Sequence, residues 1–422
     1  MERLTTIFQH LNAAEQSVGL REVAALPSYQ RKADDIVVVS ALRTPITKAK
    51  RGYFKDTYVD DMLAAVFQGV LSDTGLSASD IADVCVGNVG DPKIALTARV
   101  AQFFSGMPET VPVYHTNRQC ASGLQAFMNV AGSLKTGQCD IGIAAGVESL
   151  SKNPMGASGF ELNPRLKDYP KAQDALLPMG ITSENVASRF GISRRAQDEF
   201  AFASQQKAAK AAATGLFDAE IVPVTTTVAD AGGQLKTVTV SKDEGIRPTT
   251  MEGLAKLRAV FKEGGSTTAG NSSQVSDGAA AVVVTTRGEA AKRGLPVLGV
   301  LRSFAVIGCP PDIMGIGPAV AIPEALKKAG LKIDDIDVYE INEAFASQAR
   351  YCVEKLGIPF ERVNPKGGAI ALGHPLGCTG ARMIATLLHE LKRRGKRSMG
   401  IVSMCMGTGM GAAAVFEYEG AN

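Results

Sequence analysis

The sequence predicts a duplicated α/β fold with two similar halves, each built on a mixed, mostly parallel five-stranded sheet with helices. Short Val/Ile/Gly runs, such as residues 36–39 and 141–144, alternate with Ala-rich helical stretches, which indicates buried strands connected by helices. The second observation is an internal repeat, in which residues 79–88 resemble residues 334–342. Further along each copy, a motif that contains Cys and Gly begins an Ala-rich helix. Two copies of one βαβ-rich unit explain both observations.

The chain has 422 residues, which is too long for one hydrophobic core and suggests several domains. Residues 1–34 are expected to be a targeting segment and tether. Residues 35–150 plus 270–297 are expected to form the first half, and residues 298–422 the second. Residues 151–269 interrupt the repeat with prolines, a long polar helix pattern over 183–213 and a Thr/Val strand run over 222–240. This segment is expected to be an inserted loop domain that caps a site.

The composition excludes several classes of protein. The formal net charge is only +3, which argues against a dedicated nucleic-acid binder. Seven scattered cysteines do not form a secreted disulfide framework and indicate a reducing compartment. No Cys or His pair has the spacing of a metal site, so no metal is expected. The longest apolar runs are too short to span a bilayer.

The first eleven residues contain a pattern of the kind found in targeting signals. Arg3-Leu4, five residues, and then His10-Leu11 resemble the type 2 peroxisomal targeting signal. Leu4 and Leu11 fall on one stripe of a helix, and Arg3 and His10 share a face that a receptor could read. The alternative is an amphipathic tail that matches by chance. We expect recognition by the peroxisomal import receptor for this signal, and a place in the peroxisomal matrix.

Cys120 lies in the sequence Asn-Arg-Gln-Cys-Ala-Ser-Gly and precedes a predicted helix from Leu124 to about Lys135. The positive end of a helix dipole should lower the pKa of a thiol placed there and favour the thiolate. Nearby backbone N–H groups could hold an oxyanion. The plain alternative is an inert cysteine of the core.

Three further residues have the chemistry of a catalytic site. His374 lies in a glycine-rich stretch and is followed by a proline, which is an unusual way to build a core. Cys405 follows the predicted strand 400–403 and could act as an acid or base. Asn342 follows the predicted strand 338–341, and its amide could donate to a water or an oxyanion. The alternatives are a solvated turn histidine for His374, a small buried hydrophobic residue for Cys405 and a helix N-cap for Asn342.

Together these motifs resemble the thiolase family, and the match extends over residues 36–418. The matching motifs, in the family's order, are Asn117-Arg118-Gln119-Cys120, Asn342-Glu343-Ala344-Phe345, Gly373-His374-Pro375-Leu376-Gly377 and Cys405-Met406-Gly407. The resemblance implies an acyltransferase that splits 3-ketoacyl-CoA with free CoA, the last step of fatty-acid β-oxidation. It also implies an α/β/α/β/α layering around shared central helices.

The resemblance also implies a role for each residue. Cys120 would be the nucleophile that becomes acylated, and His374 would take its proton and then donate to the thioester oxygen. A water held by Asn342 would complete that oxyanion hole. The backbone N–H groups of Cys120 and Gly407 would form a second one. Cys405 would protonate the departing acetyl-CoA enolate and then deprotonate CoA, with ping-pong kinetics.

For the substrates, the resemblance points to Ser273 in a pantetheine-contacting loop, Arg247 near the nucleotide end, and Met179 in the acyl channel. The inserted domain would thus bind CoA, which is a substrate, and no further cofactor is expected. A homodimer is implied by the family.

Other functions compete with this interpretation. A decarboxylating ketoacyl synthase would share the fold, but it should have His or Asn where Cys405 stands. The biosynthetic direction, which condenses two acetyl-CoA molecules, uses the same residues. A non-catalytic CoA or lipid carrier would not need Cys120, His374 and Cys405 together. A papain-like hydrolase would not explain the repeat.

Overall fold

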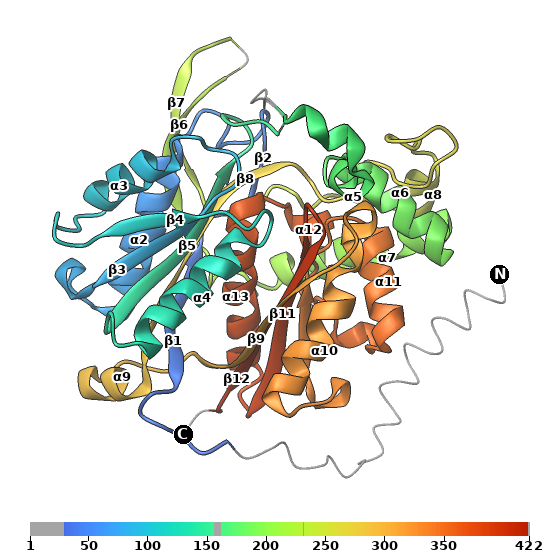
Figure 1. The fold of residues 1–422 in the computed structure, drawn as a ribbon. Coiled ribbons are helices and arrows are strands. Elements are labelled where there is room, and N and C mark those ends of the chain that lie inside the picture. Colours follow the sequence, from blue (N-terminus) through green and yellow to red (C-terminus); the bar gives the residue numbers. More distant parts are fainter. Residues whose placement is uncertain (1–28, 156–161, 231, 421–422) are drawn as a thin grey trace. The chain divides into compact units, whose positions relative to one another are not determined.

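Strands of the two halves form the framework of the fold (Figure 1). The computed structural model of the chain describes residues 29–155, 162–230 and 232–420. By its contacts the chain divides into Met1–Arg31 and Lys32–Asn422, and the second unit carries every element discussed below. Its strands are β1 (Ile36–Arg43), β2 (Thr47–Lys48), β3 (Asp83–Gly87), β4 (Val113–Thr116), β5 (Ile141–Ser149), β6 (Val224–Ala229), β7 (Leu235–Val240), β8 (Ser276–Thr286), β9 (Gly299–Gly308), β10 (Val338–Ile341), β11 (Ser398–Met406) and β12 (Met410–Tyr418).

The main strands run in the order β10-β11-β12-β9-β1-β8-β5-β3-β4, and β2 pairs with β8. The first half contributes β1, β8, β5, β3 and β4, and the second contributes β9, β12, β11 and β10. Strand pairing between the two halves is limited, in the described residues, to two residue pairs between β1 and β9. The predicted α/β class and mixed sheets are therefore confirmed.

Strand direction needs a correction in detail. Among the named strands of the described residues, parallel pairing is limited to β3–β4, β3–β5 and β10–β11, while β1, β2, β8, β9 and β12 pair antiparallel. The expectation of mostly parallel strands came from unbroken apolar runs. Here β8 is almost wholly buried although its partners are antiparallel. Helices cover both faces of these strands, so an apolar run does not reveal direction.

The predicted fifth strand of the second half is reduced to one bridge in the described residues. Val363 pairs in parallel with Tyr339, at the place that β4 occupies beside β3. Asn364 then adopts a left-handed backbone with φ 43°. Pro365 follows and has no N–H to continue a ladder, so the strand stops after one pair.

Helices form three layers around the two sets of strands (Figure 1). The longer helices are α2 (Val59–Thr74), α3 (Ile94–Phe104), α4 (Ser122–Lys135), α6 (Met179–Phe190), α7 (Arg194–Ala213), α10 (Gly317–Ala329), α11 (Ala346–Leu356) and α13 (Leu376–Arg393). The shorter ones are α5 (Pro170–Asp174), α8 (Met251–Ala255), α9 (Arg287–Arg293) and α12 (Ala369–Leu372), with single 3₁₀ turns η1 (Ala78–Asp80), η2 (Pro164–Asp168), η3 (Pro311–Ile316), η4 (Ile333–Asp335) and η5 (Phe360–Arg362).

The two central helices lie between the two sets of strands. α4 packs on α13, and α13 contacts β5 and β8 of the first half as well as β11 of the second. α2 covers the outer face of the first half and α10 that of the second. The predicted α/β/α/β/α layering is thus confirmed for the unit that carries the strands.

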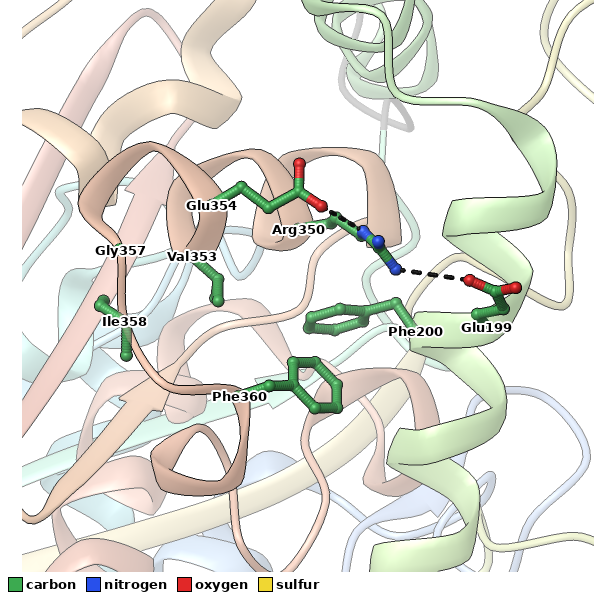
Figure 2. Close-up of a pocket in the computed structure, with 8 residues that line it drawn as sticks. All are labelled: Glu199, Phe200, Arg350, Val353, Glu354, Gly357, Ile358 and Phe360. Carbon is green, nitrogen blue, oxygen red and sulfur yellow. Dashed lines mark hydrogen bonds and ion pairs between the residues drawn. The ribbon is translucent and has the colours of Figure 1, made fainter. Parts of the chain in front are cut away.

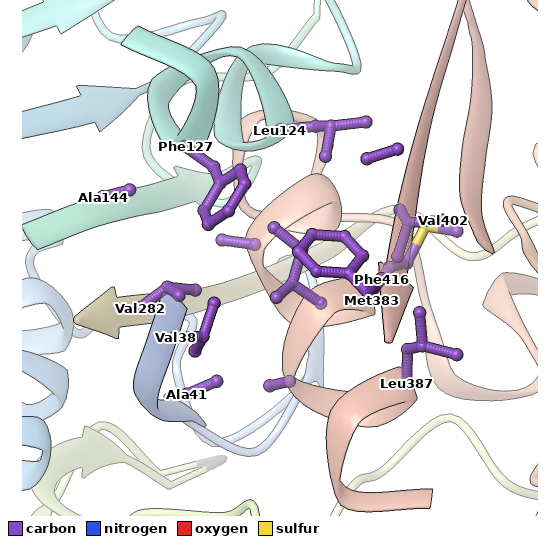
Figure 3. Packing of buried hydrophobic residues seen from close by; sticks show 14 of the residues in the cluster. Val38, Ala41, Leu124, Phe127, Ala144, Val282, Met383, Leu387, Val402 and Phe416 are labelled. Atoms are coloured by element: carbon purple, nitrogen blue, oxygen red, sulfur yellow. The ribbon is translucent and has the colours of Figure 1, made fainter. Parts of the chain in front are cut away.

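The largest hydrophobic cluster fills this central layer (Figure 3). Phe127 of α4 and Phe416 of β12 meet there with ring centroids 5.3 Å apart. Val38, Val282 and Val402 bring the strands of both halves to the same cluster. Burial of each such side chain contributes about 1.5–3 kcal/mol, so the two halves are stabilised as one body.

The duplication is visible in the order of elements. In the first half, β1 leads to α2, η1, β3, α3, β4, α4 and β5. In the second half, β9 leads to α10, η4, β10, α11, the Val363 bridge, α13 and β11. The repeated sequence 79–88 and 334–342 therefore marks the 3₁₀ turn and buried strand that precede each central helix.

The inserted segment differs in one element from the prediction. The polar pattern over 183–213 is not one helix, because α6 ends at Gly191 with φ 70° and Ser193 caps α7 by accepting the N–H of Ala196. The Thr/Val run forms the two-stranded hairpin β6–β7.

A buried ionic cluster connects the inserted segment to both halves. Glu220 accepts from Arg43 of β1 at 2.8 Å, from Lys366 at 2.7 Å and from Thr386 of α13 at 2.9 Å. Burial alone would raise the pKa of Glu220, but Lys366 and Arg43 outweigh burial and hold it at about 2. Lys366 therefore depends on this carboxylate, while Arg43 is shared between Glu220 and Asp243.

Candidate active site

Cys120 lies in a tight turn between β4 and α4. The turn is held by the N–H of Gln119, which donates to Asn117 Oδ1 at 2.9 Å, and by the N–H of Arg118, which donates to Ser122 Oγ at 3.0 Å. Gln119 has a left-handed φ of 49°. A non-glycine residue in that conformation is strained and occurs often at functional sites. The helix α4 begins at Ser122, so the predicted place of Cys120 is confirmed.

The prediction that Cys120 has a lowered pKa is wrong. Burial raises the pKa of its thiol to about 11, and the nearby charge of Glu148 adds to this. The backbone N–H groups of Gly407 and of Cys120 itself hydrogen-bond the sulfur and lower the pKa, without reversing the effect of burial. A helix end carries only about half a charge, which is too little to offset the desolvation of this half-buried thiol. The resting residue is therefore a thiol and needs a base.

His374 is a buried, neutral imidazole. Its Nδ1 lies 2.7 Å from Thr379 Oγ1, and its Nε2 lies 3.4 Å from Asn342 Nδ2. Because an amide NH₂ can only donate, Nε2 is the acceptor and Nδ1 carries the proton that Thr379 accepts. Burial, together with the positive charge of Arg382, lowers the pKa of the imidazole to about 3. The ring therefore stays neutral at ordinary pH, with a lone pair on Nε2.

Asn342 is fixed directly after β10. Its N–H donates to Ser403 O of β11 at 2.9 Å, and its carbonyl accepts from Gln348 Nε2 at 3.1 Å. Its side-chain Oδ1 is buried and has no hydrogen-bond partner among the described residues. A buried amide oxygen of this kind can accept from a water molecule, which is the role expected of Asn342.

Cys405 lies inside β11 and not after it, which corrects the predicted strand boundary. Its side chain is buried against Met314, Ala344 and Phe345. Burial raises the pKa of the Cys405 thiol well above its usual value, and the neighbouring Cys120 adds to this. The residue is therefore held in the protonated form, which can donate a proton.

Gly407 begins the turn between β11 and β12, where Thr408 has a left-handed φ of 69°. This conformation lets the turn reverse sharply. The Gly407 N–H meets the Cys120 sulfur there.

One apolar cavity collects most of these groups. Cys120, His374, Cys405, Met179 and Ser273 all line it, with Met314 and Phe345 among the apolar residues of its wall. A second hollow shares Cys120 and Met179 with the first, and it adds Gly407 and residues of the turn before Cys120. Two thiols and a neutral imidazole thus meet where α4 and α13 begin and β11 ends.

The residues predicted to contact the acyl chain or CoA differ in how deeply they are buried. Met179 is the first residue of α6 and packs against the cluster around Cys405. Ser273 donates its N–H to Ala344 O at 3.0 Å, and the adjacent Gln274 O accepts the His374 N–H at 2.9 Å. Arg247 does not line the cavity. Its guanidinium is exposed and lies 3.4 Å from Ala269 O, at the other end of the same loop.

Two residues of the site were not predicted. Thr379 is buried in α13 and orients His374, but a threonine within a helix gives no sequence signal. Glu148 is a fully buried carboxyl near Cys120. A charged residue at the end of the apolar run 141–147 was a signal that could have revealed it.

Another hollow is lined by neither Cys120 nor Cys405, and Figure 2 shows the residues around it. Phe200, Phe360 and neighbouring apolar side chains form its floor, and on its rim Arg350 lies 2.7 Å from Glu354 and 3.7 Å from Glu199. It contains no thiol and no imidazole, and its charges are already paired. The chemistry is therefore assigned to the cavity around Cys120.

Three other predictions concern the targeting residues, metal binding and membrane-spanning helices. Arg3, Leu4, His10 and Leu11 lie outside the described residues. Within the part of the chain that the structure describes, no three His, Cys, Asp or Glu side chains are grouped as metal ligands. No helix in the described ranges combines the length and apolar character needed to cross a bilayer.

Comparison with known families identifies the class of protein. Residues 36–288 match the family described as thiolase, N-terminal domain, and residues 295–418 match the one described as thiolase, C-terminal domain. The chain belongs to the thiolase family, and it carries the two thiols and the histidine in one cavity.

Individual relatives are similar over their full length. A protein of Rattus norvegicus named 3-ketoacyl-CoA thiolase A, peroxisomal, is 63% identical over all of this chain and 98% of its own length. The human 3-ketoacyl-CoA thiolase, peroxisomal, is 61% identical over all of both chains. Among solved structures, the dimeric peroxisomal thiolase of Saccharomyces cerevisiae is 47% identical, with a TM-score of 0.86 over 92% of this chain and 99% of that one.

Proposed function

We propose that this enzyme cleaves 3-ketoacyl-CoA with free CoA, giving acetyl-CoA and an acyl-CoA that is shorter by two carbons. The observation that carries the proposal is the single cavity lined by Cys120, His374 and Cys405. The names of the relatives, 3-ketoacyl-CoA thiolases of peroxisomes, support the same substrate and place the reaction in peroxisomal fatty-acid β-oxidation.

In the first half-reaction, His374 Nε2 takes the proton of the Cys120 thiol as the sulfur attacks the C3 keto carbon. The C2–C3 bond then breaks, and its electrons move to the acetyl-CoA enolate. Cys405 gives its proton to that enolate, and the acyl group remains on Cys120 as a thioester. The neutral imidazole and the two protonated thiols are consistent with these starting states.

In the second half-reaction, the Cys405 thiolate takes the proton of the incoming CoA thiol. The CoA sulfur attacks the acyl thioester, and Cys120 leaves and regains its proton from His374. Protonated His374 and a water on Asn342 would stabilise the thioester oxygen of the enolate. The N–H groups of Cys120 and Gly407 would hold the oxygen of the acyl group. Two separate half-reactions predict ping-pong kinetics.

CoA itself carries the reaction, and we propose no other cofactor. Ser273, at the cavity, would contact the pantetheine arm, and exposed Arg247 would meet the nucleotide end of CoA. Met179 would line the acyl channel. In this proposal residues 151–269 supply the cap and the Arg247 contact to CoA. Residues 35–150 plus 270–297 and residues 298–422 carry the catalytic loops, and Ser273 adds a CoA contact from the first half.

We further propose a homodimer in the peroxisomal matrix. β4 stands at the edge of the strand order and, among the described residues, has a strand partner on one side only. Leu96, Phe103, Phe104 and Tyr114 are exposed on and near it. An open edge beside exposed aromatic side chains favours association. Arg3, Leu4, His10 and Leu11 would serve the import receptor.

The test is CoA-dependent loss of 3-ketoacyl-CoA over short, medium and long acyl chains, with wild type and Cys120→Ser side by side. The proposal expects cleavage by wild type and loss of activity in the variant. Wild type that binds CoA but is inactive at every chain length would contradict it and would favour a carrier.

A further inference from the structure

Glu148 is a buried carboxyl to which the reaction above gives no role. It lies near the end of β5 and has no solvent exposure. Four N–H donors surround its two oxygens. Oε1 accepts from Gly90 N at 2.9 Å and Asn88 Nδ2 at 3.2 Å, and Oε2 accepts from Val89 N and Gly377 N, both at 3.0 Å.

These donors suit an ionised carboxylate, which only accepts hydrogen bonds. Among the described residues no Lys, Arg or His lies within ion-pair distance of Glu148, so backbone and amide N–H groups replace a counter-ion. Burial raises the pKa of Glu148 to about 7, although the N–H groups of Gly377, Gly90 and Val89 oppose this. Above neutral pH the group is therefore a buried, unpaired negative charge.

The donors belong to two loops that form walls of the site. Val89 and Gly90 follow β3 and line the hollow that contains Cys120. Gly377 stands in the first turn of α13, directly after cavity-lining Leu376 and three residues after His374. The loops touch through their backbones, because a Cβ on Gly377 would lie only 2.6 Å from Asn88 Cα. Glu148 thus joins the loop of one half to the histidine loop of the other.

We infer that Glu148 is a positioning residue for the Cys120–His374 pair, which clamps the two loops and holds a negative charge near Cys120. The inference rests on the function proposed above. Three titratable groups face Glu148, namely Cys120 before α4, Cys378 of α13 and Asp91 of the loop after β3. Cys405 is a further titratable group, and the charge of Cys120 raises its pKa. A like charge near Cys120 makes its thiolate less stable.

The test is Glu148→Gln, which keeps the size but turns one acceptor into an NH₂ group. In either orientation that group faces two N–H donors, those of Val89 and Gly377 or those of Gly90 and Asn88. A displacement of about 1 Å in a catalytic pair lowers the rate by up to about 100-fold, so kcat should fall roughly 10- to 100-fold while KM for CoA changes less. The pH profile of Cys120 alkylation by iodoacetamide should move to lower pH, because the neighbouring charge is lost. If Glu148 only stabilised the fold, the pH profile of Cys120 alkylation would be the same in Glu148→Gln as in wild type.

Two further variants serve as comparisons. Glu148→Asp keeps the charge but is one methylene shorter, so kcat should fall while the alkylation profile stays at the wild-type pH. Asp83→Asn alters a buried carboxyl at the opposite end of β3 and should leave both readouts unchanged.

Wild-type kcat in Glu148→Gln would overturn the inference, and so would a loss of kcat with an unchanged alkylation profile. If the Gln variant does not fold, wild-type kcat in Glu148→Asp would overturn it. The alkylation profile does not depend on turnover. An inactive wild type would therefore contradict the proposed function while the inference about Glu148 is still tested.

Discussion

Replacement of Thr379 by valine removes the group that fixes the tautomer of His374. Thr379 Oγ1 lies 2.7 Å from His374 Nδ1, and both residues are buried. Valine has nearly the same shape, but it leaves the Nδ1–H without an acceptor. An unsatisfied buried donor costs about 1–3 kcal/mol, and each 1.36 kcal/mol is a factor of ten. The tautomer with a free lone pair on Nε2 should therefore be disfavoured roughly 5- to 150-fold.

The assay is steady-state cleavage of 3-ketoacyl-CoA by wild type, Thr379→Val and Thr379→Ser. In Thr379→Val kcat should fall by a factor within that range, while KM for CoA changes little because Thr379 does not line the cavity. The serine variant keeps the hydroxyl and should retain most of the activity. A valine variant with wild-type kcat would refute the assignment of Nε2 as the base.

Other variants test the packing and the buried charges. In α4, Gly123→Ala would place Cβ 2.7 Å from Gly377 O and should destabilise by several kcal/mol, whereas Gly132→Ala meets nothing within 4 Å and should stabilise by about 0.5–1 kcal/mol. Urea unfolding distinguishes the two, and equal effects would contradict the close approach of the central helices. Glu220→Gln leaves two buried cations short of a partner and should cost about 3–5 kcal/mol in the same experiment, so a neutral result would argue against the cluster. His374 takes up a proton below about pH 6.5 in the unfolded state but only below about pH 3 in the folded state, so between these values the unfolded state binds one more proton. The free energy of unfolding should therefore fall with falling pH by up to about 1.4 kcal/mol per pH unit. His374→Gln should show a shallower pH dependence, and an identical slope would exclude a buried neutral imidazole.

The class of fold could be predicted because its features are local in the sequence. Buried strands such as β1 and β8 appear as apolar runs, and the repeated turn-strand sequence marks the duplication. Strand direction could not be predicted, since helices cover both faces of parallel and antiparallel strands alike. The missing fifth strand depends on a single left-handed residue, Asn364, whose conformation is set by tertiary contacts.

The candidate site was predicted as a set of motifs, and the structure brings Cys120, His374 and Cys405 to one cavity. The charge state of Cys120 was not predictable, because the degree of burial around a thiol is a tertiary property that outweighs the helix end. Glu148 acts through hydrogen bonds between segments far apart in the sequence, and Thr379 acts through a local contact with His374 that depends on how the turn before α13 folds, so residue type alone gave them no role.

The most direct test of the mechanism is to find the acyl group. Wild-type enzyme would be mixed with a 3-ketoacyl-CoA in the absence of free CoA, quenched with acid, digested and analysed by mass spectrometry. The account predicts an acyl thioester on the peptide containing Cys120, which disappears when CoA is added before quenching. An acyl group on Cys405 instead, or release of acetyl-CoA with no acylated peptide, would contradict it.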